Sequence, residues 1–280
     1  MRTLVALIRL LRPLNLLITV VGVLLGAALS SAPAFIVDLG AVVLAAASAL
    51  AIAAGGNALN DVYDADIDFV NRPSRPIPSG LVSSETARII WITATLFGVG
   101  AAAFVSSIHL TLAFLATVLL FTYSRYLKRM PFVGNLAIAA VVALAIVYGG
   151  WAVGSPVPSL VGAAFAALTT FAREIVKDIE DLEGDARAGA RTAPVAFGVG
   201  VPRVAASATL ILTVVLTPLP FLLMDYSPLF LFLMLTADAF LLRALWLMPS
   251  TPDEAAPASA WLKGAMLAGI AALFAAGAIR

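Results

Sequence analysis

NALNDVYDADIDFVNRPSRPIPSG, residues 57–80, begins where a long apolar run ends and brings four aspartates within eight residues. The run before it is long enough to cross a membrane as a helix. Because successive residues of a helix lie about 100° apart, Asp61, Asp64 and Asp68 fall within about 60° of arc. Asn57 lies on the same side. The stretch therefore predicts that three carboxylates converge at the end of a membrane-spanning helix.

A second stretch, REIVKDIEDLEGDARAGARTAP at residues 173–194, repeats this spacing. Four of its acidic residues follow one another at the intervals that separate Asn57, Asp61, Asp64 and Asp68; they are Glu174, Asp178, Asp181 and Asp185. Two such clusters in one chain predict one shared site. Hard divalent cations such as Mg²⁺ bind oxygen ligands and are commonly completed by substrate phosphates. We therefore expect a Mg²⁺-dependent site for a diphosphate.

The composition places the chain among polytopic membrane proteins. Hydrophobic residues make up 62% of it and charged residues 12%, and the mean hydropathy is +1.04. The formal net charge of +1 and the lack of a basic run with interleaved aromatic residues argue against a nucleic-acid partner. With no cysteine and one histidine, thiolate or histidine metal sites are not expected.

We expect an all-α fold of nine transmembrane helices in a single domain, residues 1–280. Apolar runs near membrane length predict the helices, with residues 107–109 as a tight connection between the third and the fourth. The expected ranges are 14–31, 39 to the first cluster, 86–106, 110–126, 133–153, 158–178, 201–224, 229–247 and 260–279. The second and sixth helices run in the same direction four helices apart, which predicts two parallel four-helix repeats plus a ninth helix.

The basic residues predict how the chain is oriented in the cell membrane. Sixteen of the seventeen Lys and Arg residues fall at the N-terminus or on one predicted side of the membrane, and only Arg280 lies opposite. Positive residues favour the cytoplasmic side. We therefore expect a multi-pass protein with a cytoplasmic N-terminus and with both carboxylate clusters on the cytoplasmic side.

Basic and polar residues near the clusters are candidates for binding substrate. Arginine has a forked donor that suits phosphate oxygens, and prolines stiffen the loop that follows the first cluster. The predicted substrate-binding residues are Asn57, Asn60, Arg72, Arg75, Tyr123, Lys128, Lys177 and Arg191. The predicted catalytic residues are Asp61, Asp64, Asp68, Asp178, Asp181 and Asp185, and all six, together with Asn60, are also predicted metal ligands.

A prenyl diphosphate matches both ends of such a protein, because its tail belongs in the membrane and its head at the interface. Metal ions and basic side chains would neutralise the departing diphosphate, so that C1 of the allylic chain gains cationic character. A nucleophilic, lipophilic acceptor then takes the chain. The apolar helices would exclude water, which is the competing nucleophile.

At these two stretches the sequence resembles the UbiA superfamily of intramembrane prenyltransferases. Members carry an NDxxDxxxD motif after the second helix and a DxxxD motif after the sixth, and these are found here at residues 60–68 and 181–185. The resemblance implies nine helices, a prenyl diphosphate bridged to the aspartates by Mg²⁺, and a central cavity that opens sideways to membrane lipid.

Within the superfamily, NRPSRPIPSG and AREIVKDIEDLEGDARAGARTAP are most similar to the archaeal branch that forms digeranylgeranylglyceryl phosphate. That likeness implies geranylgeranyl transfer from geranylgeranyl diphosphate to geranylgeranylglyceryl phosphate in ether-lipid synthesis. Branches that use aromatic acceptors, such as 4-hydroxybenzoate or homogentisate, share both motifs and stay an alternative.

Two other classes of membrane protein fit less well. A cation-coupled transporter would place its acidic residues near the membrane midplane in broken helices, whereas these lie at helix ends beside arginine-rich loops. A CDP-alcohol phosphotransferase needs a DG…AR…G…D…D order that neither stretch supplies.

Overall fold

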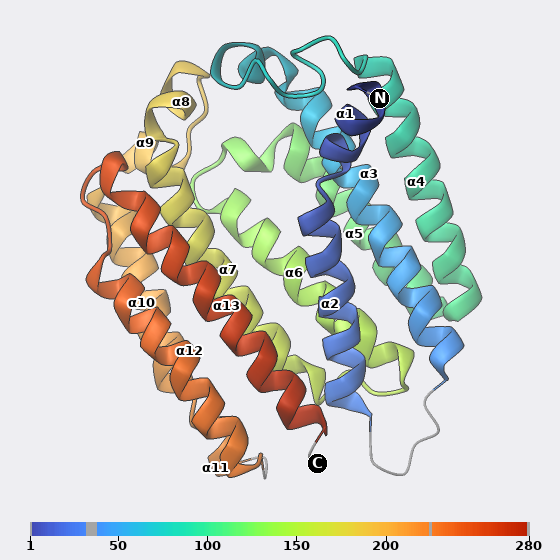
Figure 1. Cartoon of the computed structure of the whole chain (residues 1–280), viewed down its shortest axis with the longest axis vertical. Coiled ribbons are helices and arrows are strands. Elements are labelled where there is room, and N and C mark those ends of the chain that lie inside the picture. Colours follow the sequence, from blue (N-terminus) through green and yellow to red (C-terminus); the bar gives the residue numbers. More distant parts are fainter. Residues whose placement is uncertain (1, 32–37, 224–225, 279–280) are drawn as a thin grey trace.

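A computed structural model describes residues 2–31, 38–223 and 226–278 of the chain, and these residues fold as a bundle of helices (Figure 1). The long helices are α2 (Pro13–Ser30), α3 (Leu39–Asn71), α4 (Ser84–Val105), α5 (Ser107–Arg125), α6 (Val133–Ala152), α7 (Ser159–Glu180), α10 (Gly200–Leu216), α12 (Pro228–Trp246) and α13 (Ala255–Ala278). Short helices are α1 (Arg2–Leu11), η1 (Leu127–Arg129), α8 (Leu182–Arg187), α9 (Ala193–Phe197), α11 (Leu219–Leu223) and η2 (Pro252–Glu254).

Nine segments within the described residues are long and apolar enough to cross a membrane, as predicted. Their outer surfaces carry large apolar side chains, among them Phe104 at 84% and Trp246 at 82% exposed. In a soluble protein such a surface would be unfavourable, whereas in a bilayer it faces lipid. The multi-pass membrane architecture is therefore confirmed. The arrangement as two repeats stays a prediction.

One predicted boundary is wrong. Residues 107–109 were expected to connect two helices, but they form the first turn of α5. Ser106 alone separates α4 from α5, because its extended backbone ends one helix while its Oγ accepts a hydrogen bond from the His109 N–H at 3.3 Å. The predicted seventh span, 201–224, corresponds to Gly200–Leu223. A short turn divides it into α10 and α11, since Pro218 cannot continue the helical hydrogen bonding.

Two further features, helix α1 and a hydrogen bond to Asp238, were not predicted from the sequence. Helix α1 is amphipathic: Ala6 and Leu10 are buried against α3 and the loop before α4, while Leu4 and Ile8 are exposed. In α12 the buried Asp238, for which no partner was predicted, accepts a hydrogen bond from Thr217 Oγ1 at 2.9 Å. That bond satisfies a polar group inside an apolar bundle.

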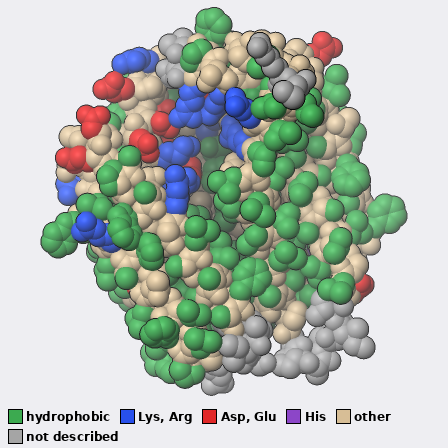
Figure 2. Space-filling model, in the orientation of Figure 1, with side chains coloured by type: hydrophobic (Ala, Val, Ile, Leu, Met, Phe, Trp, Pro, Cys, Tyr) green, Lys and Arg blue, Asp and Glu red, His purple; other side chains and the backbone are tan. Residues whose placement is uncertain are grey.

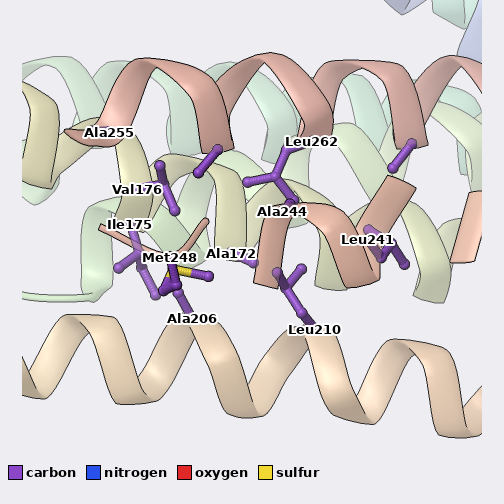
Figure 3. Close-up of a cluster of buried hydrophobic side chains, with 12 residues drawn as sticks. Ala172, Ile175, Val176, Ala206, Leu210, Leu241, Ala244, Met248, Ala255 and Leu262 are labelled. Atoms are coloured by element: carbon purple, nitrogen blue, oxygen red, sulfur yellow. The ribbon is translucent and has the colours of Figure 1, made fainter. Parts of the chain in front are cut away.

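The largest buried cluster joins the second half of the chain. Figure 3 shows side chains from α7, α10 and α12 meeting those of α13, with Ala172, Ala206, Ala244 and Ala255 among them. Small side chains let helices approach closely, which is the usual basis of packing between helices in membranes.

Glycines bring α2 and α6 together in the first half of the chain. A Cβ built on Gly26 would lie 1.7 Å from the Ile146 carbonyl oxygen, and one on Gly149 would lie 1.8 Å from the Val23 carbonyl oxygen. Only glycine fits at these two positions, so the crossing of α2 and α6 depends on both.

The two carboxylate clusters lie at the same end of the bundle. In Figure 1 that end is the upper one, where α1, the loop between α3 and α4, and α8 are found, whereas α13 finishes at the lower end. Helix α2 packs against both α3 and α7, and so does α6. These two central helices therefore hold α3 and α7 on opposite sides of one space.

Candidate active site

The last turns of α3 carry the first cluster, whose carboxylates contact cationic side chains. Arg12 contacts Asp61, and Arg75 contacts Asp68 and lies 3.8 Å from the Asp61 carboxylate. Asp61 and Asp68 are only 4% and 5% exposed. A buried carboxylate needs a charged or hydrogen-bonding partner, so these arginines fix the two aspartates in place.

Asp64 has different partners from its two neighbours. Its carboxylate contacts the ammonium group of Lys128 on η1 and accepts a hydrogen bond from Asn60 Nδ2 at 2.8 Å. Burial lowers the pKa of Lys128, and the negative charge of Asp64 opposes that effect. The Oδ1 atom of Asn60 is buried and has no hydrogen-bond partner among the described residues. An unused oxygen acceptor therefore lies beside a carboxylate.

The second cluster is not arranged like the first, although its spacing in the sequence is the same. Helix α7 ends at Glu180, Asp181 forms the junction, and α8 begins at Leu182. Asp178 accepts a hydrogen bond from Asn135 Nδ2 at 2.8 Å, and Asp185 accepts one from Thr192 Oγ1 at 3.0 Å. Burial raises the pKa of Asp185, while the Thr192 hydrogen bond lowers it. The second cluster is therefore divided between two helices at Asp181.

Contacts across the central space connect the two clusters. Arg72, which follows α3, donates from Nη2 to Asp181 Oδ1 at 3.3 Å. The Tyr123 hydroxyl on α5 interacts electrostatically with Asp64 of the first cluster and with Asp178 of the second. The two motifs, more than a hundred residues apart in the chain, therefore face one region.

Three of the predicted substrate-binding residues make contacts other than ion pairs with the aspartates of the two clusters. Asn57 Nδ2 donates to the Leu11 carbonyl oxygen at 2.8 Å, which ties α1 to α3. Lys177 Nζ lies 3.9 Å from Glu174 Oε2 on its own helix. The backbone N–H of Arg191 donates to the Arg129 carbonyl oxygen at 3.1 Å, which joins the loop after α8 to η1.

Three contributors to the site were not predicted from the sequence: Arg12, Asn135 and Thr192. Arg12 was counted only as a residue that orients the membrane topology. It has a left-handed backbone, with φ of 54°, at the junction of α1 and α2, and its side chain reaches α3. Asn135 could have been noticed as an amide at the start of an apolar helix.

An apolar cavity lies on the membrane side of the clusters. It is lined by residues of α2, α3, α5, α6, α7, α10, α12 and α13, including Ala53 on α3, Leu120 on α5 and Thr169 on α7. Ala53 precedes Asp61 by eight residues on the same helix, which is about 12 Å at 1.5 Å per residue. Figure 2 shows a hollow on this face of the molecule with Lys and Arg side chains gathered around it. Helices α3 and α7, which lead into the carboxylate clusters, therefore also line the apolar cavity.

The donor set suits a hard cation. Six carboxylates and the unpartnered Asn60 Oδ1 supply only oxygen atoms, which are the ligands that Mg²⁺ prefers. Within the described part of the chain, no three acidic or histidine side chains lie close enough together to bind one ion. The predicted convergence of Asp61, Asp64 and Asp68 is thus only partial, because Arg75 lies near both Asp61 and Asp68 whereas Asp64 contacts Lys128.

Known proteins resemble this chain along nearly its whole length. The sequence model of the UbiA prenyltransferase family matches residues 15–276. The digeranylgeranylglyceryl phosphate synthase of Methanopyrus kandleri is 39% identical over 270 residues, which cover 96% of this chain and 98% of that protein. A solved structure from work on digeranylgeranylglyceryl phosphate synthase in membranes has a TM-score of 0.83 at 28% identity and covers 99% of both chains. The structure of a UbiA homologue from Archaeoglobus fulgidus bound to GPP and Mg²⁺ has a TM-score of 0.74 at 21% identity, over 96% of this chain and 99% of that one.

Proposed function

This chain belongs to the UbiA prenyltransferase family, and from that premise we propose that it transfers a geranylgeranyl group from geranylgeranyl diphosphate to geranylgeranylglyceryl phosphate, a step in ether-lipid synthesis. The C1–O bond to the diphosphate breaks, an ether bond to the acceptor hydroxyl forms, and the hydroxyl proton is released. The observation that carries the proposal is that cation-paired carboxylates lie at the end of α3, a helix that also lines the apolar cavity.

The predicted metal ligands are the oxygens of Asp61, Asp64, Asp68, Asp178, Asp181, Asp185 and Asn60. Mg²⁺ held there supplies charge neutralisation for the departing diphosphate. The presence of Mg²⁺ with GPP in a protein of the same fold supports this assignment.

The chain's own residues bind the substrate and keep water away from it. Arg72, Arg75 and Lys128 contact the carboxylates and can donate to phosphate oxygens from the same positions. The charges of Glu174, Asp178 and Asp64 act on the Tyr123 hydroxyl, which makes it a further candidate for binding the substrate. The apolar cavity holds the isoprenoid chain and excludes water from the reacting carbon.

A phosphate on the acceptor needs cations that the carboxylates do not already occupy. Among the described residues, the side chains of Arg129 and Arg191 have no ion-pair partner, and both are exposed. Their backbones are hydrogen bonded to each other at 3.1 Å, beside Thr192, which contacts Asp185. We assign these two arginines to the acceptor phosphate.

We expect Arg191→Gln to raise the KM for geranylgeranylglyceryl phosphate roughly tenfold, because a hydrogen bond between charged groups contributes about 1.5–3 kcal/mol. The KM for geranylgeranyl diphosphate should stay within about twofold. Initial rates with one substrate varied at a time measure both. Arg187→Gln is the matched control, since Arg187 is also exposed nearby but pairs with Glu183. An equal rise in both KM values would contradict the assignment of Arg191 to the acceptor phosphate.

The acceptor itself is tested by direct competition. Purified protein with geranylgeranyl diphosphate and Mg²⁺ is given geranylgeranylglyceryl phosphate and 4-hydroxybenzoate together, and the products are identified by mass. We expect the ether-linked product to predominate. Faster transfer to 4-hydroxybenzoate in the same lipid would establish the aromatic-acceptor alternative instead.

We also propose that the site faces the cytoplasm. Because the chain has no cysteine, Ser74→Cys, Ala188→Cys and Ser31→Cys each create a single labelling position. In intact cells, a thiol reagent that cannot cross the membrane should label position 31 only, and disruption of the cells should expose 74 and 188. Labelling of positions 74 and 188 in intact cells would contradict the proposed orientation and indicate the opposite one.

A further inference from the structure

Three glycines line the apolar cavity, and one of them differs from the others in its surroundings. A Cβ added to Gly22 would make an ordinary contact, 3.6 Å from Ala145 Cβ, and one added to Gly162 would come within 2.8 Å of Leu29 Cδ1. A Cβ added to Gly269 on α13 would meet nothing within 4 Å. Gly269 therefore leaves open space in the cavity wall.

Close helix packing does not explain this glycine. Within a helix, glycine is about 0.8–1 kcal/mol less favourable than alanine, so it usually occurs where helices approach closely. Gly26 and Gly149 are of that kind, because a Cβ there would overlap backbone atoms. Gly269 has no such neighbour. The missing side chain changes only the width of the cavity.

The depth of Gly269 determines which ligands could reach it. Helix α13 begins at Ala255, which packs against Ile175 and Val176 just before Asp178. From residue 255 to residue 269 the helix rises about 21 Å at 1.5 Å per residue. Further along, Leu273 packs against Leu25 and Leu29. A chain whose diphosphate lies at the carboxylates must therefore be long to pass Gly269.

We propose that Gly269 sets the length of the isoprenoid chain that the cavity accepts from the prenyl diphosphate. The absent side chain leaves a path along α13 between Ala265 and Leu273, two other lining residues on that helix. A long isoprenoid tail occupies this path, whereas a short tail ends before it. The inference rests on the proposed prenyl transfer and adds to it a specificity-determining residue.

The test enlarges the side chain at this position in steps. We expect Gly269→Leu and Gly269→Phe to lower kcat/KM for geranylgeranyl diphosphate by on the order of tenfold or more, since blocking one apolar subsite changes specificity to that extent. The kcat/KM for geranyl diphosphate should change less than about twofold. Gly269→Ala should lie between the wild type and Gly269→Leu in its ratio of the two values.

The matched control is Gly100→Leu. Gly100 lies within α4, is exposed, does not line the cavity, and a Cβ there also meets nothing within 4 Å. This variant should keep the wild-type preference between the two diphosphates. Equal losses for both substrates in Gly269→Leu, or an unchanged ratio, would overturn the inference.

Equilibrium binding of the two labelled diphosphates in Mg²⁺ separates this inference from the proposed function. A wild-type protein that binds both diphosphates but transfers neither contradicts the proposed function. In that case a selective loss of geranylgeranyl diphosphate binding in Gly269→Leu still supports the role of Gly269. Failure of the wild type to bind geranylgeranyl diphosphate would overturn both proposals.

Discussion

Asp181→Ala is expected to lower kcat/KM for prenyl transfer by on the order of a hundredfold or more, which corresponds to about 2.7 kcal/mol of transition-state stabilisation. Asp64→Ala should have an effect of the same size. The loss arises because each substitution removes one predicted oxygen ligand from the group that neutralises the departing diphosphate. Initial rates with saturating acceptor measure it.

The two variants differ in how cleanly they test the site. Asp181 is half-exposed and its partner Arg72 is exposed, so Asp181→Ala leaves no buried charge without a partner. Lys128 is mostly buried against Asp64, so Asp64→Ala leaves an unpaired cation and is best compared with Asp64→Asn. Asp66→Ala is the matched control, because Asp66 lies in the same motif but is exposed. Near-normal turnover in both Asp64→Ala and Asp181→Ala would contradict a shared site.

Removal of divalent cations is expected to abolish activity, again by on the order of a hundredfold or more, and added Mg²⁺ should restore it. Arg72, Arg75 and Lys128 already contact carboxylates, so these side chains alone cannot neutralise the leaving group. Rates are measured with a chelator, then with the same chelator and excess Mg²⁺, which controls for effects of the chelator itself. Undiminished transfer in the chelator would exclude a role for a divalent cation.

The nine spans could be predicted from the sequence because apolar runs of membrane length alternate with loops rich in proline, glycine and charge. The residues at which individual helices begin and end were less predictable. The triplet at residues 107–109 contains serine and histidine and was interpreted as a loop, yet one capping serine suffices to separate α4 from α5. The repeated spacing of the acidic residues gave no sign that a separate short helix, α8, carries Asp185.

The positions of the carboxylates were predictable in the same way, but their partners were not. Periodicity along one helix places Asp61 and Asp68 on the same side, and the structure brings both to Arg75. Contacts such as Asn135 to Asp178 and Arg12 to Asp61 depend on how separate helices pack, which no local pattern records. The cavity, lined by eight helices, was implied only by the family resemblance.

The ion pairs at the end of α3 also bear on the order in which the protein can be made. Arg12 precedes Asp61 by 49 residues, Arg75 follows Asp68 by seven, and Lys128 follows Asp64 by 64. Asp61, Asp64 and Asp68 thus each find a counter-charge before any of α7 leaves the ribosome. Asp181 comes last, 109 residues after its partner Arg72. The first half of the chain can therefore enter the bilayer with these three carboxylates already paired, while a complete reaction centre forms only after α8 has been synthesised.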